Sequence, residues 1–376
     1  MAEYLTNTTD LTLVADAIRI KGGTTELLAY PDEFVTAIQA IQTGTELQII
    51  VTVESGATVT ATKGSKVVSG TSVNGTCILT VPEAGKWTVS ATLGGQTSNS
   101  NIVNVVSSYD TSLAFISTTL NNNSWEAIRG ISDAGQGANY WSIGDRKAVA
   151  LNGKVGRLTL SNYTTYAFII GFNHNASVEG SNRIHFQLAK TALTGGKDVC
   201  LCDGYYNWNV DTTGYFSMNS SDTNSGGWKS SQMRTKICGT SLSSYSGTII
   251  AVIPAALRAV LKSVTKYTDN TGGGSTAASA VTATTDYFFL LSEYEVFGSI
   301  SYANTNEKNK QAQYAYYSAG NSKIKYKHDE TSTVAPWWLR CPRARYSTSF
   351  VNVYPNGTVD SYTANISSGF APGFCV

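Results

Sequence analysis

The chain has 376 residues and a net charge of +1, and its charged fraction of 14% lies well below the roughly 25% usual for soluble domains. So small a net charge leaves no electrostatic footprint for nucleic acid or for an anionic membrane. The length predicts two or three domains. Because charged residues are few, the polar residues are mainly Ser, Thr and Asn, and the chain also has many Gly and 21 tyrosines. This composition is typical of proteins with many short strands and long loops.

Neither a secretory signal nor a membrane span is visible in the sequence. The N-terminal residues Met-Ala-Glu-Tyr-Leu-Thr-Asn lack a basic segment followed by an apolar one. The most apolar stretch, residues 248–261, contains Pro254 and Arg258 and is too short to cross a bilayer. We therefore expect no membrane insertion.

Six cysteines are spread over the chain without the spacing of a disulfide framework or a metal site. Two of them form a Cys-x-Cys pair, but no second pair stands at metal-site spacing, and the chain has only three histidines. We expect free, buried or half-buried thiols, with a disulfide or a metal as the alternative. The six are Cys77, Cys200, Cys202, Cys238, Cys341 and Cys375.

Residues 1–45 are predicted to form a helical module. From Asp10, a suitable N-cap, apolar residues follow helical spacing until Lys21-Gly22-Gly23 ends the pattern. A second helix is expected to begin at Pro31 and to run through Ile41. Two short amphipathic helices bury little surface by themselves, so we expect them to dock onto a partner or onto copies of the chain.

Residues 46–106 change to a period of two. Four segments alternate apolar residues with Thr or Ser between turns that contain Gly, which predicts a small β-sandwich. Aromatic residues do not gather in it, so we expect a spacer and not a sugar-binding module. The segments are 47–53, 57–62, 77–81 and 87–93.

Residues 107–376 are predicted to form a larger α+β domain, because the helices are too few and the strands too short for a wound α/β sheet. Two stretches rich in Gly, Ser and Thr, 217–227 and 268–285, are expected to be solvated loops. Strands are expected at 166–172, 248–253 and 287–291, and helices at 229–237 and 255–264.

The first two modules resemble parts of phage tail proteins. The sequence TDLTLVADAIRIKGG…YPDEFVTAIQAI is similar to an N-terminal module of tail proteins from phages of gut Firmicutes, which implies attachment to a tail. The sequence VPEAGKWTVSATLGG is similar to immunoglobulin-like, carboxypeptidase-regulatory-like spacer modules.

Nearly all of residues 107–376 resembles an uncharacterised domain that is widespread in gut bacteria and their phages. Seven segments carry the likeness in order: YWSIGDRKAVALNG, IHFQLAKT, GGWKSSQMRTKIC, IPAALRAVLKSVTKYT, FFLLSEYEVFG, QYAYY and WWLRCP…V…NGTV…GFAPGFCV. This resemblance implies a C-type lectin fold, in the branch shared with the formylglycine-generating enzyme. Some members of that branch are variable proteins of diversity-generating retroelements, in which adenine-directed mutagenesis rewrites scattered codons near the C-terminus.

The last forty residues alternate framework with the composition of a recognition surface. The run Trp337–Leu339 predicts a buried strand, after which Arg340 is expected to point inward to a partner. The residues between this run and the terminal Gly369–Val376 are rich in Tyr, Arg, Ser and Asn, which supply rigid contact area and adaptable hydrogen bonds. The predicted ligand-binding residues are Arg343, Arg345, Tyr346, Ser347, Thr348, Ser349, Asn352, Tyr354, Asn356, Ser361, Tyr362 and Asn365.

The resemblance implies a phage tail receptor-binding protein, an adhesin for host attachment. Its expected partners are a bacterial cell-surface protein or glycan and other phage tail proteins, and a homotrimer is the expectation for tail fibres. Its expected location is the virion, in the phage tail, assembled in the bacterial cytoplasm, where no export signal is needed. We expect no cofactor, metal or catalytic residue, and no carboxylate cluster is dense enough to predict calcium.

Two alternatives remain at this point. The chain is a structural fibre or baseplate component without its own ligand, or an oxidase like the formylglycine-generating enzyme, whose chemistry needs a pair of reactive cysteines. Cys341 and Cys375 are the candidates for such a pair, and the adjacent Arg343 would lower the pKa of Cys341. The scattered histidines, His174, His185 and His328, suggest no Ser-His-Asp grouping.

Overall fold

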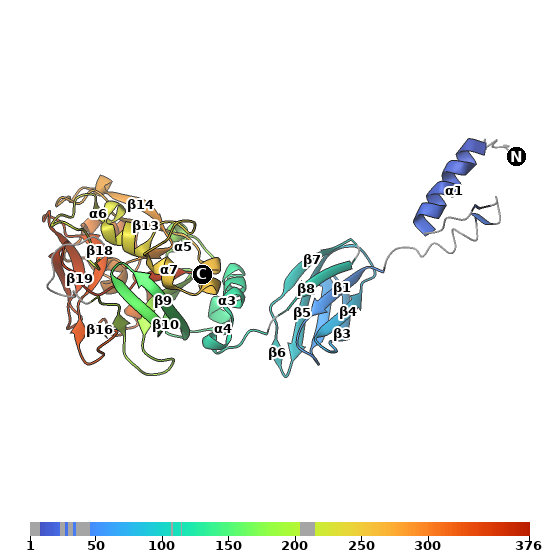
Figure 1. The fold of residues 1–376 in the computed structure, drawn as a ribbon, viewed down its shortest axis with the longest axis horizontal. Helices are drawn as coiled ribbons and strands as arrows, with labels where there is room; N and C mark the ends of the chain where they lie inside the picture. Colours follow the sequence, from blue (N-terminus) through green and yellow to red (C-terminus); the bar gives the residue numbers. More distant parts are fainter. Residues whose placement is uncertain are drawn as a thin grey trace. The chain divides into compact units, whose positions relative to one another are not determined.

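The computed structural model describes residues 8–22, 27–28, 33–34, 46–106, 108–113, 115–203 and 215–376 (Figure 1). They divide into two compact units, Met1–Phe115 and Ile116–Val376. The architecture is mixed α+β with several small sheets. Among the described residues, no helix combines the length and apolarity that a membrane crossing requires.

The first expected helix is present as α1 (Thr8–Gly22), which ends where Lys21-Gly22-Gly23 predicted. Its residues Ala15 and Ile18 are buried with Phe34 in a small apolar cluster. Of the second expected helix, only Phe34 and its neighbour Glu33 fall in the described part of the chain.

Two sheets in the first unit enclose one apolar core. One sheet has the order β4-β1-β8, and the other has the order β3-β2-β5-β6, with β7 also paired to β5. Along β5, Trp87, Val89 and Ala91 are buried between exposed or half-buried neighbours, so the predicted period of two is confirmed. The strands are β1 (Gln48–Thr52), β2 (Thr58–Lys63), β3 (Lys66–Thr71), β4 (Thr76–Thr80), β5 (Gly85–Leu93), β6 (Gln96–Thr97), β7 (Asn101–Val105) and β8 (Ser108–Ser112).

The first unit extends beyond the boundary expected at residue 106. Strand β8 pairs in parallel with β1, Gln48 lying opposite Ser108, and Leu113 adds its side chain to the same core. The second unit therefore begins at Ile116. The sequence Ser-Tyr-Asp-Thr-Ser of β8 is polar and mostly exposed, so it carried no hydrophobic alternation that would have predicted a strand.

The second unit is built around a five-stranded sheet with the order β15-β21-β11-β10-β9. The C-terminal strand β21 lies between β11 and β15, which fixes the end of the chain in the interior of the sheet. These strands are β9 (Arg146–Val155), β10 (Leu158–Phe172), β11 (Ile184–Lys190), β15 (Phe288–Phe289) and β21 (Gly373–Cys375).

Opposite faces of this sheet are covered by different elements. On one face, helix α3 (Trp125–Asp133), capped by Ser124, places the Trp125 ring edge-on to Phe186 and Phe374. On the other face, Tyr317 donates a 2.6 Å hydrogen bond to Gln187 Oε1. The large buried core of this unit is continuous across both layers.

Shorter elements complete the second unit. The remaining strands form a β13–β14 hairpin and two three-stranded sheets, β12-β16-β17 and β18-β19-β20. The strands are β12 (Val199–Cys200), β13 (Val264–Asp269), β14 (Val281–Asp286), β16 (Lys325–Lys327), β17 (Val334–Ala335), β18 (Trp337–Pro342), β19 (Ser349–Val353) and β20 (Val359–Thr363). The short α-helices are α4 (Gly137–Tyr140), α5 (Ala176–Glu179), α6 (Gly227–Ser230), α7 (Ile249–Val252), α8 (Ala255–Val260), α9 (Glu293–Phe297) and α10 (Ala315–Ser318). Short 3₁₀ turns span Leu120–Asn122, Ala278–Ala280 and Thr305–Asn309, and a π turn spans Met233–Cys238.

Three local predictions in this unit are wrong. The apolar run 248–253 forms helix α7 and not a strand, an ambiguity that short apolar runs do not resolve by themselves. The supposed loop 268–285 contains the end of β13 and most of β14. The supposed solvated loop 217–227 contains Ser217 and Asn224, both fully buried.

The two separate cores predict two separable unfolding transitions. Trp87 is fully buried in the first unit, and Trp228 is fully buried in the second. We expect Trp87→Ala to destabilise only the first transition and Trp228→Ala only the second, each by about 3–5 kcal/mol. Urea unfolding followed by circular dichroism measures both. A substitution that moved both transitions equally would show one cooperative unit instead.

Candidate ligand-binding surface

The sheet β18-β19-β20 carries the residues predicted to bind a ligand. Strand β18 is buried along its whole length, which confirms the prediction for Trp337–Leu339. Its two indole nitrogens donate to main-chain oxygens at 2.9 Å, Trp337 to Lys323 and Trp338 to Phe216. This strand is therefore framework, fixed by packing and by satisfied polar atoms.

Arg340 points inward from β18 to a partner, as predicted. Its guanidinium forms a buried ion pair with Glu295 of α9, with 2.9 Å between Nη2 and Oε1. It also donates to Thr268 Oγ1 at 2.6 Å and to the main-chain oxygen of Leu290 at 2.9 Å. Burial alone would lower the pKa of Arg340, but the charge of Glu295 raises it above its ordinary value.

Lys266 of β13 extends this network and was not singled out by the sequence. Its Nζ lies 2.6 Å from Glu179 Oε2, 3.0 Å from Glu295 Oε1 and 2.8 Å from the Tyr314 hydroxyl. Glu179, Glu295 and His174 also place ligand atoms within 4.8 Å of one another, close enough to share a metal ion. Because the Lys266 ammonium already bonds both carboxylates, a metal there would have to displace it.

The connection from β18 to β19, residues 343–348, is held through its main chain. Its amide and carbonyl groups bond neighbours that are distant in sequence, so main-chain hydrogen bonds fix its conformation. The bonds run from Ala344 N to Tyr302 O at 2.8 Å, from Arg345 N to Gly274 O at 3.0 Å, from Asn224 N to Ser347 O at 2.8 Å and from Ala364 N to Thr348 O at 2.8 Å.

Asn224 is the centre of this support. Its fully buried side chain donates to the carbonyl oxygens of Tyr346 and Ser349, both at 2.7 Å, and accepts from Gly273 N at 2.7 Å. Nothing in the sequence indicated this residue, because it lies in a stretch of Ser, Asn, Thr and Gly that is typical of loops. An Asn side chain suits the position because it both donates and accepts.

Gly274 lets the main chains approach closely. Its φ of +82° is in the left-handed region, and a Cβ there would lie 3.2 Å from main-chain atoms of Arg345 and Tyr346. Arg345 itself has a φ of +65°, which is uncommon for a residue other than glycine. The conformation of the loop is thus fixed by its main chain, and Arg345 is held in a strained backbone conformation.

The exposed members of the predicted ligand-binding set fall at two ends of β19. Arg345, Tyr346 and Ser347 are exposed in the loop before this strand, whereas Tyr354 and Asn356 are exposed in the turn after it. A five-residue strand spans about 17 Å, so the two groups form separate patches. The half-buried members are Arg343, Thr348, Ser361, Tyr362 and Asn365.

Arg343 organises the first patch. Its guanidinium lies 3.7 Å from the centre of the Tyr346 ring and 4.9 Å from that of Tyr302, and Nη1 donates to Ser361 Oγ at 2.9 Å. Arg343, Tyr346 and Tyr302 border a hollow of about 370 Å³, together with Thr276. Tyr302 lies 41 positions from Arg343 in the sequence, so sequence did not connect the two.

Ser349 and Asn352 are corrections to the predicted surface. They are 7% and 0% exposed, because both faces of β19 are covered, and alternation along the strand therefore does not distinguish inside from outside. Neither amide atom of Asn352 has a hydrogen-bond partner among the described residues. A buried amide in this state costs stability, so the amide of Asn352 adds no hydrogen bond to the fold.

All six cysteines are free and buried, but the expectation that Arg343 lowers the pKa of Cys341 is wrong. Burial raises the pKa of Cys341 well above its ordinary value, although Arg343 stands two positions away. Burial also raises the pKa of Cys375 to about 12. Both thiols are therefore protonated near neutral pH, whereas reactive cysteines work as thiolates.

Comparisons with known proteins cover part of the chain, and this part includes the whole surface. Residues 205–376 match the model of a family described as a domain of unknown function (DUF6273). The matched segment contains Asn224, Lys266 and the whole of β18-β19-β20. No curated protein matches the chain.

The support from Asn224 predicts a contrast in stability. Asn224→Ala removes two donors and leaves the buried carbonyl oxygen of Ser349 without its side-chain partner, so we expect a loss of about 2–4 kcal/mol. Ser347→Ala, in the exposed loop, should change stability by less than about 0.5 kcal/mol. Urea unfolding measures both. Equal losses would mean that the loop side chains, and not its main chain, hold the conformation.

The buried carboxyl of Glu307 predicts a pH dependence. Burial raises its pKa from 4.5 to about 7, and Cys341 Sγ donates to it at 2.9 Å. The protonated carboxyl of Glu307 therefore contributes fully to the stability of the fold below pH 4.5, and this contribution is lost as the pH rises to 7. We expect the stability of wild type relative to Glu307→Gln to fall across this window by up to about 1.4 kcal/mol per pH unit. A difference independent of pH, measured by urea unfolding at several pH values, would contradict the shift.

Proposed function

We propose that this chain is a receptor-binding protein of a phage tail, and that residues 343–348 present its principal ligand-contacting side chains. One observation supports this most strongly. The loop is fixed by main-chain bonds to Asn224, Gly274 and Tyr302, while the side chains of Arg345, Tyr346 and Ser347 are left exposed. In such an arrangement, main-chain bonds maintain the fold, while the exposed side chains are available to contact a ligand.

The side chains of the first patch suit a polar or partly aromatic ligand. Tyr346 offers a rigid ring with a hydroxyl, and Arg345 offers several donors at a fixed position. Arg343 is stacked on Tyr346 and so orders that ring before any ligand arrives, which lowers the entropy lost on binding. Contact with a host surface protein or glycan would use this preorganised group.

The other modules take supporting roles in this proposal. The second unit is proposed to have a C-type lectin fold, and the two sheets of the first unit an immunoglobulin-like one that acts as a spacer. The N-terminal helical module would attach to other tail proteins in the virion, and a homotrimer would present several copies of the patch. Several weak sites on one particle would then bind with high avidity.

Diversification of the surface by a retroelement is part of the same proposal. Rewritten codons are tolerated only where the fold does not use the side chain. Arg345 and Ser347 meet that condition by exposure, whereas the fully buried Asn352 does not. Tyr354 and Asn356 form a second patch that the same process would vary independently.

An enzyme is the weaker proposal. The cysteines that would have to react, Cys341 and Cys375, are each 0% exposed and hold raised pKa values. Cys341 Sγ instead donates to Glu307, and Cys375 Sγ lies 3.3 Å from His185 Nδ1. These contacts suit structural thiols inside a packed core.

Substitutions in the first patch test the proposal. We expect Arg345→Ala with Tyr346→Ala to reduce adsorption of the purified chain to host cells by more than about tenfold, because hot-spot Arg and Tyr contacts carry most of a binding energy. The melting temperature should stay within about 2 °C of wild type, since surface substitutions change stability little.

Matched surface changes supply the control. Asn356→Ala alters the second patch, and Tyr109→Ala removes an exposed tyrosine of the first unit. Tyr109→Ala should leave adsorption unchanged. If the Arg345 and Tyr346 substitutions left adsorption intact while Asn356→Ala abolished it, the contact would lie at the turn and our assignment of the first patch would be wrong.

A further inference from the structure

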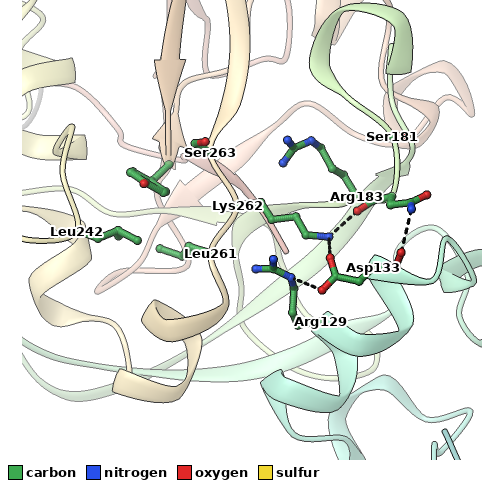
Figure 2. Close-up of a pocket in the computed structure, with 10 residues that line it drawn as sticks. Arg129, Asp133, Ser181, Arg183, Leu242, Leu261, Lys262 and Ser263 are labelled. Atoms are coloured by element: carbon green, nitrogen blue, oxygen red, sulfur yellow. Dashed lines mark hydrogen bonds and ion pairs between the residues drawn. The ribbon is translucent and has the colours of Figure 1, made fainter. Parts of the chain in front are cut away.

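A second hollow in the larger unit shares no residue with the surface described above. It has a volume of about 420 Å³ and lies between the end of α3, the start of β11 and the connection from α8 to β13 (Figure 2). Its lining residues are Arg129, Asp133, Ser181, Asn182, Arg183, Leu242, Leu261, Lys262, Ser263 and Tyr287.

The described lining of this pocket carries an excess of positive charge. Three cationic side chains face one carboxylate, so the net charge is +2. That carboxylate, Asp133, is shared: Arg129 Nε donates to it at 2.8 Å, and Lys262 Nζ lies 2.7 Å from it. Figure 2 shows both interactions converging on Asp133, and no dashed line reaches the guanidinium of Arg183.

Arg183 is the cation in this lining that has no ion-pair partner among the residues that the structure describes. Its Nε and Nη1 atoms are buried, yet neither has a hydrogen-bond partner among the described residues. Leaving a buried charged donor unsatisfied is costly, and folds ordinarily avoid it. An adjoining hollow of about 20 Å³ has room for one water, which would satisfy one N–H but would not neutralise the charge.

The opposite wall of the pocket is apolar. Leu242, Leu261 and the half-buried Tyr287 line it, so it offers contact area to the body of a ligand whose charged end meets the cations. A pocket that combines an apolar wall with a few convergent polar groups is the usual form of a small-molecule site.

We propose that this pocket binds an organic carboxylate, whose oxygens pair with Arg183 and whose apolar part contacts Leu242, Leu261 and Tyr287. Because Nε and Nη1 of Arg183 are buried, the carboxylate would meet the part of the guanidinium that lines the pocket and would pair with its charge. Lys262, held by Asp133 and by the main-chain oxygen of Asn182 at 2.5 Å, adds attraction without needing to move. The inference rests on this site alone and does not depend on the proposed host-binding function.

Calorimetric titration of the full chain with benzoate, acetate and inorganic phosphate tests the assignment. Benzoate should bind best, because it alone supplies both the carboxylate and an apolar ring. We expect Arg183→Gln to weaken benzoate binding by more than about tenfold and Arg183→Lys by less, since a lysine keeps the charge. Asp133→Asn, which removes the competing carboxylate, should strengthen it.

Arg157→Gln is the matched control, because Arg157 contacts Tyr215 elsewhere in the same unit. It should leave benzoate affinity unchanged. Without ligand, Arg183→Gln should melt at the same or a higher temperature than wild type, as expected when an unpaired, partly buried charge is removed. A large loss of melting temperature in Arg183→Gln would assign Arg183 to the fold. Absence of benzoate binding, or binding of phosphate in preference to benzoate, would overturn the proposal.

Discussion

The buried contact between Arg340 and Glu295 is the constraint on which the recognition surface depends. It joins β18 to α9, and Lys266 joins the same carboxylate to β13 and to Glu179 of α5. Removing one partner of a buried pair leaves an uncompensated charge, at a cost of about 3–5 kcal/mol. Because these charges meet in the interior of the second unit, β18 cannot shift without breaking them, and the loop that follows it begins from a fixed point.

Beyond that fixed point, the residues that hold the loop differ from the residues whose side chains it exposes. Asn224 and Gly274 hold the main chain of residues 343–348, so the exposed side chains of Arg345 and Tyr346 are left out of the hydrogen bonds that fix the loop. This division is what a binding protein with changeable specificity would require. Asn352 is an exception to this division, because it is buried in the sheet while its amide has no hydrogen-bond partner among the described residues.

The sequence predicted the frame better than it predicted the surface. Trp337–Leu339 was readable because a bulky apolar run before a proline is typical of a buried strand, and Arg340 followed from its place in that run. Asn224 was not readable, since its role depends on main-chain atoms more than a hundred positions away. Ser349 looked exposed because its residue type usually is, whereas burial on both faces of β19 is a property of tertiary packing.

The central claim is that the loop before β19 is free to change while the strand before it is not. Two display libraries of the full chain test this, one randomised at Arg345, Tyr346 and Ser347 and the other at Trp337, Trp338 and Leu339. Each is sorted for protease resistance, which reports folding, and separately for binding to host cells. Most members of the first library should fold and few should bind, whereas few members of the second should fold. Equal folding fractions in the two libraries would contradict the account.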